Sequence, residues 1–153
     1  MILTDEIREV LCGGVSIVLA SRNAALEPSI ARAVGCRVVG TRLRILVSVA
    51  QAGRVLDDVR ESAMISATFS VPKTHRALQF KGNDARIEPV DADDRAALQR
   101  YLPAFAAGID PLGFHEPFVR AFLATPHDEV AIEFTPAEAF QQTPGPAAGR
   151  RIG

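Results

Sequence analysis

Polar side chains gather in one stretch of the chain, THRALQFKG, in a pattern that suits ligand binding. His75, Arg76 and Gln79 fall at the start of a predicted strand and along it, where they bring imidazole, guanidinium and amide groups together. The same pattern is typical of an exposed strand edge whose polar groups prevent aggregation. These residues therefore either contact a ligand or protect the edge of a sheet.

A single arginine, Arg32, stands among apolar residues in the segment PSIARAVGCRVVG. A guanidinium in a buried strand needs an anion beside it, because an unpaired buried charge is costly. That anion is either a carboxylate such as Glu27 or Asp84, or a phosphate, which the guanidinium fork binds through two parallel hydrogen bonds. Arg32 is thus a candidate phosphate-binding residue, with a structural ion pair as the alternative.

The other reactive residue types form no recognisable catalytic or metal-binding pattern. Cys12 and Cys36 lack the paired spacing of a zinc site, so we predict small core side chains and no metal site. Capping of a helix explains the run of Asp91, Asp93 and Asp94. The sequence has no GxSxG, HExxH or GxxxxGKS/T motif, and no GxGxxG opens a helix after a strand. These absences argue against the hydrolase, zinc protease and P-loop classes.

Composition narrows the class of protein further. The 153 residues are 48% hydrophobic and 23% charged, which predicts one globular domain over residues 1–153. The net charge of −1 provides no positive field for nucleic acid or an anionic membrane. The start MILTDEIREV does not resemble a signal peptide, and no apolar run reaches the ~18 residues of a membrane span. We therefore expect a cytoplasmic protein with no nucleic-acid or membrane partner.

Hydrophobic periodicity predicts mostly strands, with helices between them. A short helix capped by Thr4 comes first, an amphipathic helix covers Gln51–Glu61, and a helical insertion occupies residues 91–126. Residues 141–153 form a tail rich in Pro and Gly. Short strands joined by tight turns favour an antiparallel barrel. The six expected strands are Val15–Ser21, 28–40 with a bend at Gly35, Leu43–Val49, Met64–Ser70, Ala77–Ile87 broken by Gly82, and Val130–Phe134.

The order and spacing of these segments resemble the FMN-binding split barrels related to pyridoxamine 5′-phosphate oxidase. The resemblance rests on PSIARAV, LRILVSV, MISATFS and HRALQFKGNDARIEPV, and it covers Thr4 to Val90 and, more loosely, Val130–Phe134. It implies a mainly β fold with helices, namely a six-stranded antiparallel split β-barrel with a helical insertion. It also implies a homodimer that binds FMN in clefts between its subunits, and an oxidoreductase-like activity on a small molecule.

The resemblance also implies which residues bind the cofactor. Arg32, four residues after Pro28, would lie on the phosphate side of the flavin, and the third strand would line the flavin ring and the phosphate edge. The polar residues before Gly82 would correspond to the family's fifth strand. The implied cofactor-binding residues are Arg32, Val47, Ser48, Val49, Gln51, His75, Arg76 and Gln79.

One departure from the family pattern affects the cofactor. Members of the family commonly carry Ser-Arg-Lys or Ser-x-Lys at the start of the helix, where this chain has Ala50, Gln51 and Ala52. Desolvating the phosphate with Arg32 alone is costly unless another cation helps. The candidates are Arg54, Arg76, and Arg150 or Arg151 of the partner subunit. The alternative is a non-catalytic split barrel, a binding or sensory module that takes haem, a deazaflavin or no cofactor.

Overall fold

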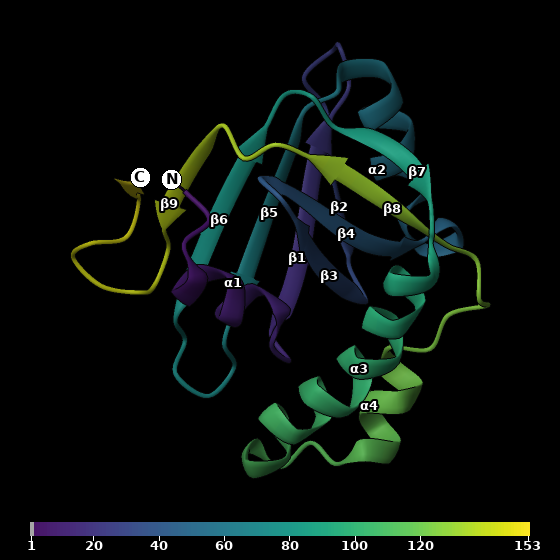
Figure 1. The fold of residues 1–153 in the computed structure, drawn as a ribbon, viewed down its shortest axis with the longest axis vertical. Helices are drawn as coiled ribbons and strands as arrows, with labels where there is room; N and C mark the ends of the chain where they lie inside the picture. The colour runs from purple at the N-terminus through teal and green to yellow at the C-terminus, as the bar shows by residue number, and fades with distance from the viewer. Residues whose placement is uncertain (1) are drawn as a thin grey trace.

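A computed structural model describes residues 2–153 as two antiparallel sheets with helices around them (Figure 1). The strands are β1 (Ser16–Arg22), β2 (Pro28–Arg32), β3 (Gly35–Val39), β4 (Arg42–Ser48), β5 (Ile65–Ser70), β6 (Ala77–Gly82), β7 (Arg86–Pro89), β8 (Glu129–Phe134), β9 (Glu138–Gln141) and β10 (Arg150–Ile152). The helices are α1 (Asp5–Cys12), α2 (Val49–Ser62), α3 (Ala92–Ile109), the 3₁₀ turn η1 (Asp110–Leu112) and α4 (Glu116–Phe122). One sheet has the strand order β10-β9-β6-β5-β1-β2, and the other has β3-β4-β8-β7.

The main hydrophobic core lies between the two sheets. Side chains alternate along β1, so that Ile17 and Leu19 are fully buried while their neighbours are only partly covered. Phe69 and Phe80, from β5 and β6, meet edge to face in this core with ring centroids 5.8 Å apart. The four-stranded sheet crosses over β1 and β2 (Figure 1), and Phe134 of β8 lies in the same core.

The expected helices form at their sequence signals. The Thr4 hydroxyl accepts a hydrogen bond from the Ile7 amide at the start of α1, as the capping pattern predicts. Asp91 and Asp94 make a reciprocal capping box at the start of α3, and α3 and α4 occupy the expected helical insertion. Within residues 2–153, no helix is both long and apolar enough to span a bilayer.

The expected strand over residues 28–40 is divided into β2 and β3, which belong to different sheets. The change of sheet falls between two adjacent residues, because the Ala33 amide bonds to Ile17 of β1 and the Val34 amide bonds to Leu46 of β4. Gly35 therefore begins a new strand and does not bend a continuous one. Its missing side chain leaves room for Leu46, whose Cδ1 would lie 3.0 Å from an added Cβ.

The expected strand Ala77–Ile87 is also two strands, β6 and β7, in different sheets. Gly82 ends β6 where the ring of Phe134 approaches so closely that an added Cβ would lie 2.5 Å from it. The predicted tail of residues 141–153 contains β10, which pairs with β9. The fold is thus a mixed one with ten strands among the described residues, all paired antiparallel. Closure into a six-stranded split barrel remains a prediction.

Candidate functional site

The six-stranded sheet has one face in the core and one face that no helix covers, which we call the outer face. Along β2 the exposure alternates strongly, with Ile30 at 73% and its neighbours Ser29 and Ala31 buried. The strand register aligns one row of outward side chains across the sheet. In order from β2 to β10 this row is Arg32, Val18, Thr68, Gln79, Phe140 and Arg151. Two of the predicted site residues, Arg32 and Gln79, therefore share this face.

Arg32 ends β2 on the outer face with polar and aromatic partners. Its Nη1 donates to the Ser16 hydroxyl at 2.9 Å, and its guanidinium lies over the Phe122 ring, 5.0 Å from the centroid. Within residues 2–153, no carboxylate lies within 4.0 Å of its nitrogens, since Arg32 takes part in none of the ion pairs. A half-buried guanidinium with neutral partners retains donor capacity for an anion.

The two carboxylates considered as partners of Arg32 are engaged elsewhere. Glu27 accepts a hydrogen bond from the Asn23 side chain at 2.7 Å. Asp84 pairs with Arg42 at 3.3 Å and accepts from the Thr135 amide at 2.8 Å. The structural ion pair proposed as the alternative for Arg32 is therefore wrong for both carboxylates.

The start of α2 is capped by a carboxylate from a distant part of the chain. Ser48, only 1% exposed, donates its hydroxyl to Asp128 Oδ1 at 2.7 Å, and the Ala50 amide donates to Asp128 Oδ2 at 2.7 Å. The hydrogen bond from Ser48, followed by the one from Ala50, holds the pKa of Asp128 below its ordinary value. Asp128 is thus ionised at neutral pH and occupies the position at the helix N-terminus that favours an anion.

Gln51 is held by the same part of the chain. Its Nε2 donates to the Ala124 carbonyl at 2.8 Å. We call residues 122–128 the α4–β8 segment, because they join α4 to β8. This segment contacts three predicted site residues: Phe122 lies against Arg32, Ala124 against Gln51, and Asp128 against Ser48. The structure therefore brings Arg32, Ser48 and Gln51 around one segment, which the sequence did not indicate.

The remaining residues of the third expected strand lie beside this segment but differ in exposure. Val47 is fully buried and pairs with Val130 of β8. Val49 begins α2 and is not part of the strand; its side chain is 41% exposed and its amide bonds to the Asp128 carbonyl. Only Val49 of the two has a side chain that a ligand could reach.

The polar stretch THRALQFKG is divided between a turn and the outer face. His75 lies in the turn between β5 and β6 with φ of +59°, and its side chain is exposed. Arg76 pairs with Glu6 of α1 at 2.8 Å. Gln79 lies on the outer face, where its Nε2 donates to the Thr68 hydroxyl at 3.4 Å. Gln79 and Arg32 are three strands apart in one row, or roughly 14 Å at the usual strand spacing, so one elongated ligand could reach both.

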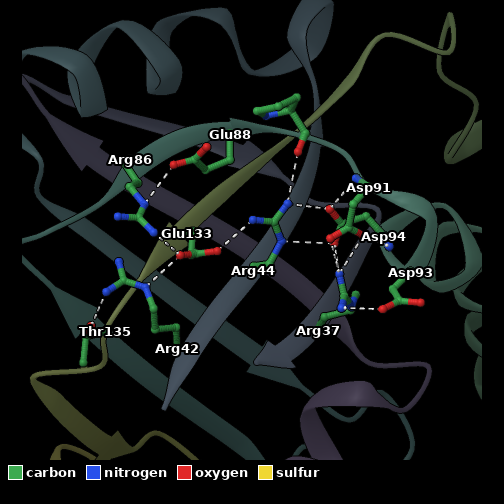
Figure 2. Close-up of polar contacts among 11 residues, drawn as sticks. Arg37, Arg42, Arg44, Arg86, Glu88, Asp91, Asp93, Asp94, Glu133 and Thr135 are labelled. Carbon is green, nitrogen blue, oxygen red and sulfur yellow. Dashed lines mark hydrogen bonds and ion pairs between the residues drawn. The ribbon is translucent and has the colours of Figure 1, made fainter. Parts of the chain in front are cut away.

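A network of arginines and carboxylates fixes α3, and with it α4, on the four-stranded sheet (Figure 2). Asp94, fully buried at the start of α3, accepts from Arg37 at 2.7 Å and from Arg44 at 2.5 Å. Arg44 also donates to Glu133 of β8 at 2.7 Å. Arg42 and Arg86 complete the network by pairing with Glu133. Because these groups are paired with one another, we assign the network a positioning role and not a ligand-binding one.

The charges in this network stabilise one another strongly. Burial raises the pKa of Asp94, but hydrogen bonds from Arg44, from the Asp91 backbone and from Arg37 outweigh it and lower the pKa to about 2. The hydrogen bond to Asp94 is the largest cause that raises the pKa of Arg44. The network joins residues up to 91 positions apart in the sequence. The available sequence signal was the spacing of Arg42 and Arg44, two residues apart on one strand and therefore on one face.

Comparison with known proteins identifies the fold. No family model and no curated protein sequence matches the chain. Among solved structures, HupZ from Group A Streptococcus superposes with a TM-score of 0.58 at 16% identity, covering 96% of this chain and 99% of HupZ. A candidate pyridoxamine 5′-phosphate oxidase from Lactobacillus delbrueckii gives 0.56 at 14% identity, with 90% and 93% covered. The chain has the fold of the pyridoxamine 5′-phosphate oxidase-like proteins. The heme storage protein HutZ from Vibrio cholerae shares this fold, with a TM-score of 0.52 at 18% identity over 92% of this chain and 95% of HutZ. The resemblance stated from the sequence is thereby confirmed at the level of the fold.

The residues fit an FMN phosphate at one of the two places that the resemblance implies. At the start of α2 they do not fit, because the ionised Asp128 already accepts the hydrogen bonds of Ser48 and Ala50 and would repel a phosphate. At Arg32 they do fit, since its guanidinium has only neutral partners within residues 2–153. Of these two places, Arg32 is the one whose present partners leave hydrogen-bond donors for a phosphate.

Proposed function

We propose that this protein is a homodimeric, FMN-binding, oxidoreductase-like protein in which Arg32 binds the cofactor phosphate. The observation that carries this proposal is the half-buried guanidinium of Arg32, which contacts the Ser16 hydroxyl and the Phe122 ring but no carboxylate within residues 2–153. A phosphate would complete the hydrogen bonding of this half-buried group and neutralise its charge. The neighbouring Phe122 ring offers an aromatic surface beside it.

The other arginines that could help Arg32 to neutralise the phosphate differ in whether a carboxylate already pairs with them. Arg76 is engaged by Glu6. Arg54 is exposed on α2, and Arg150 and Arg151 are exposed on β10 at the opposite edge of the six-stranded sheet from Arg32. Arg151 lies in the outward row, with its Nη1 3.8 Å from Glu138 Oε2, whereas Arg150 takes part in none of the ion pairs within residues 2–153. In a dimer that packs two outer faces together, Arg150 or Arg151 of the partner subunit would supplement Arg32.

A comparison of FMN with riboflavin tests the phosphate assignment, because the two differ only in the phosphate. We expect the unmodified protein to bind FMN more tightly than riboflavin. Arg32→Ala should weaken FMN binding by about 1.5–3 kcal/mol, or roughly 10- to 150-fold, and leave riboflavin binding nearly unchanged. Arg60→Ala removes an exposed arginine of α2 that pairs with Asp57 and serves as the matched control.

Flavin fluorescence quenching during titration gives both dissociation constants. Equal affinity of the unmodified protein for FMN and riboflavin would contradict a phosphate site at Arg32. Equal loss of FMN binding in Arg32→Ala and Arg60→Ala would mean that the net charge of the protein, and not a specific contact with Arg32, determines FMN affinity. Absence of binding for both flavins would overturn the FMN proposal itself.

A second candidate function is a non-catalytic binding module whose planar cofactor places no phosphate at α2. The observation that favours it is Asp128, which takes the anion position at the start of α2. The likeness in fold to HutZ, a heme storage protein, supports this candidate. Titration of the flavin-free protein with haem tests this candidate: a Soret band that saturates at one haem per chain supports it, and an unchanged spectrum of free haem contradicts it.

A further inference from the structure

Three phenylalanines form an exposed ladder that begins two residues before α4 and continues along it. Phe114, Phe118 and Phe122 follow one another at intervals of four residues, and their side chains are 48%, 53% and 50% exposed. The ring centroids of Phe114 and Phe118 are 5.5 Å apart, and those of Phe118 and Phe122 are 5.8 Å apart. The buried side of α4 is made by Val119 and Leu123 instead. The ladder is therefore a second, half-exposed apolar stripe along α4, and Arg32 lies over the ring at one end of it.

The ladder is continuous with the outer face of the six-stranded sheet. Arg32 points away from the core, since it bonds to Ser16, which also alternates outward on β1. Its guanidinium lies over the Phe122 ring, so Phe122 stands level with the outer face at the β2 edge. Ile30, 73% exposed, lies on the same strand and the same face. Ile30, Arg32 and Phe122 thus follow one another from β2 onto α4, with the guanidinium of Arg32 between the two apolar side chains.

We propose that a second copy of this chain covers the Phe114–Phe118–Phe122 ladder, so that α4 is part of the dimer interface. This inference rests on the homodimer of the proposed function and specifies where its contact lies. A contiguous exposed patch of several hundred Å² marks an interaction surface in a monomer, and the three half-exposed rings alone expose on the order of 300 Å². The partner is a second copy because the patch extends an uncovered sheet face and does not stand alone on the surface.

The area available agrees with this choice of partner. Six strands spaced about 4.8 Å apart, with about five residues at 3.3 Å each, offer roughly 450 Å² of sheet face. A stable interface of ordinary size buries about 800 Å² on each partner. The sheet face alone falls short of that value, and the sheet face with the ladder reaches approximately 750 Å². A two-fold dimer then presents the same combined surface on both copies, as an isologous contact requires.

Sedimentation velocity across a concentration series tests the assignment through the dimer dissociation constant. Phe118→Ser removes the central ring in both copies and should raise that constant at least 100-fold. Phe114→Ser, farther from the sheet, should give a smaller rise in the same direction. Val39→Ser is the matched control, because Val39 is a 41% exposed apolar residue at the end of β3 on the other sheet. The control should sediment like the unmodified protein, and far-UV circular dichroism verifies that all three variants fold.

Each outcome decides the matter. A dimer weakened by Phe118→Ser and not by Val39→Ser supports the inference. A dimer unaffected by both phenylalanine variants overturns it and leaves the homodimer standing, with the contact elsewhere. Equal weakening by Val39→Ser overturns it as well, because the effect is then not local. An unmodified protein that is monomeric at all concentrations overturns both the inference and the homodimer, whereas flavin titration tests the cofactor proposal independently.

Discussion

Replacing Asp94 should lower the free energy of unfolding, and the size of the loss tests the role assigned to the buried ion pairs. Asp94 is fully buried, it accepts hydrogen bonds from Arg37 and Arg44, and it caps α3 through the Asp91 amide. Asp94→Asn keeps the shape and removes the charge. The pKa falls from an ordinary 3.8 to about 2 in the folded protein, which corresponds to roughly 2–3 kcal/mol of folding free energy at pH 7. Asp94→Ala also removes the cap and leaves Arg44 with only one of its two carboxylate partners, so we expect a loss of roughly 3–5 kcal/mol in unfolding free energy.

The sign of the pH dependence follows from the lowered pKa of Asp94. A carboxylate whose folded pKa is depressed stabilises the protein above the unfolded pKa, and this contribution is lost as the pH falls from 3.8 towards 2. The difference in unfolding free energy between the unmodified protein and Asp94→Asn should therefore shrink to about half at pH 3. Urea denaturation followed by far-UV circular dichroism at pH 7 and pH 3 measures both values.

Asp93 provides the matched control for this experiment. It contacts the same Arg37, at 3.2 Å, but its side chain is 82% exposed. Solvent screening should limit the cost of Asp93→Asn to less than about 0.5 kcal/mol. The reasoning is refuted if Asp94→Asn costs less than about 1 kcal/mol at pH 7, if its cost is the same at pH 3, or if Asp93→Asn costs as much.

Two further predictions concern packing and thiol chemistry. Gly14→Ala should destabilise the protein by more than about 2 kcal/mol in urea unfolding, because an added Cβ would lie 2.2 Å from the Ala104 backbone of α3. Gly53→Ala in α2, with nothing within 4 Å, should stabilise it by about 0.5–1 kcal/mol, and a loss of stability there would contradict this. A thiol reagent at neutral pH should modify the exposed Cys12 and leave the buried Cys36 unreacted until unfolding, since burial raises the pKa of both thiols and shields only Cys36. Equal rates for the two cysteines, read by mass spectrometry, would refute that assignment.

The sequence predicted which segments are buried better than it predicted which sheet they join. Periodicity reports that Ile30, Val34 and Cys36 belong to apolar positions, but an apolar residue has the same pattern whichever sheet it pairs with. The crossing between Ala33 and Val34 therefore left no trace in the hydrophobic pattern. The division after Gly82 was marked by the glycine, yet a glycine also fits a bulge within one strand.

The candidate site was only partly predictable for a related reason. Arg32 was recognisable because a charge inside an apolar strand is unusual. Asp128 carried no signal, since its partners Ser48 and Ala50 lie about eighty residues earlier, and a lone aspartate after a helix usually faces solvent. The resemblance implied a phosphate at the start of α2, where the structure has the carboxylate of Asp128. Long-range contacts of this kind become visible only when the chain is folded.

The position of β8 has a consequence for how the chain is made. This strand lies between β4 and β7 in the four-stranded sheet, and it brings Glu133 to the arginines of that sheet. During synthesis, β7 has no neighbour in its sheet, and Arg44 lacks one of its two carboxylate partners, until residues 129–134 have left the ribosome. Strand β7 and one edge of β4 must therefore stay unpaired, and open to aggregation, while residues 90–134 are made. A nascent chain stalled before Glu129 should consequently be bound by chaperones, and one released after Phe134 should begin to close its second sheet.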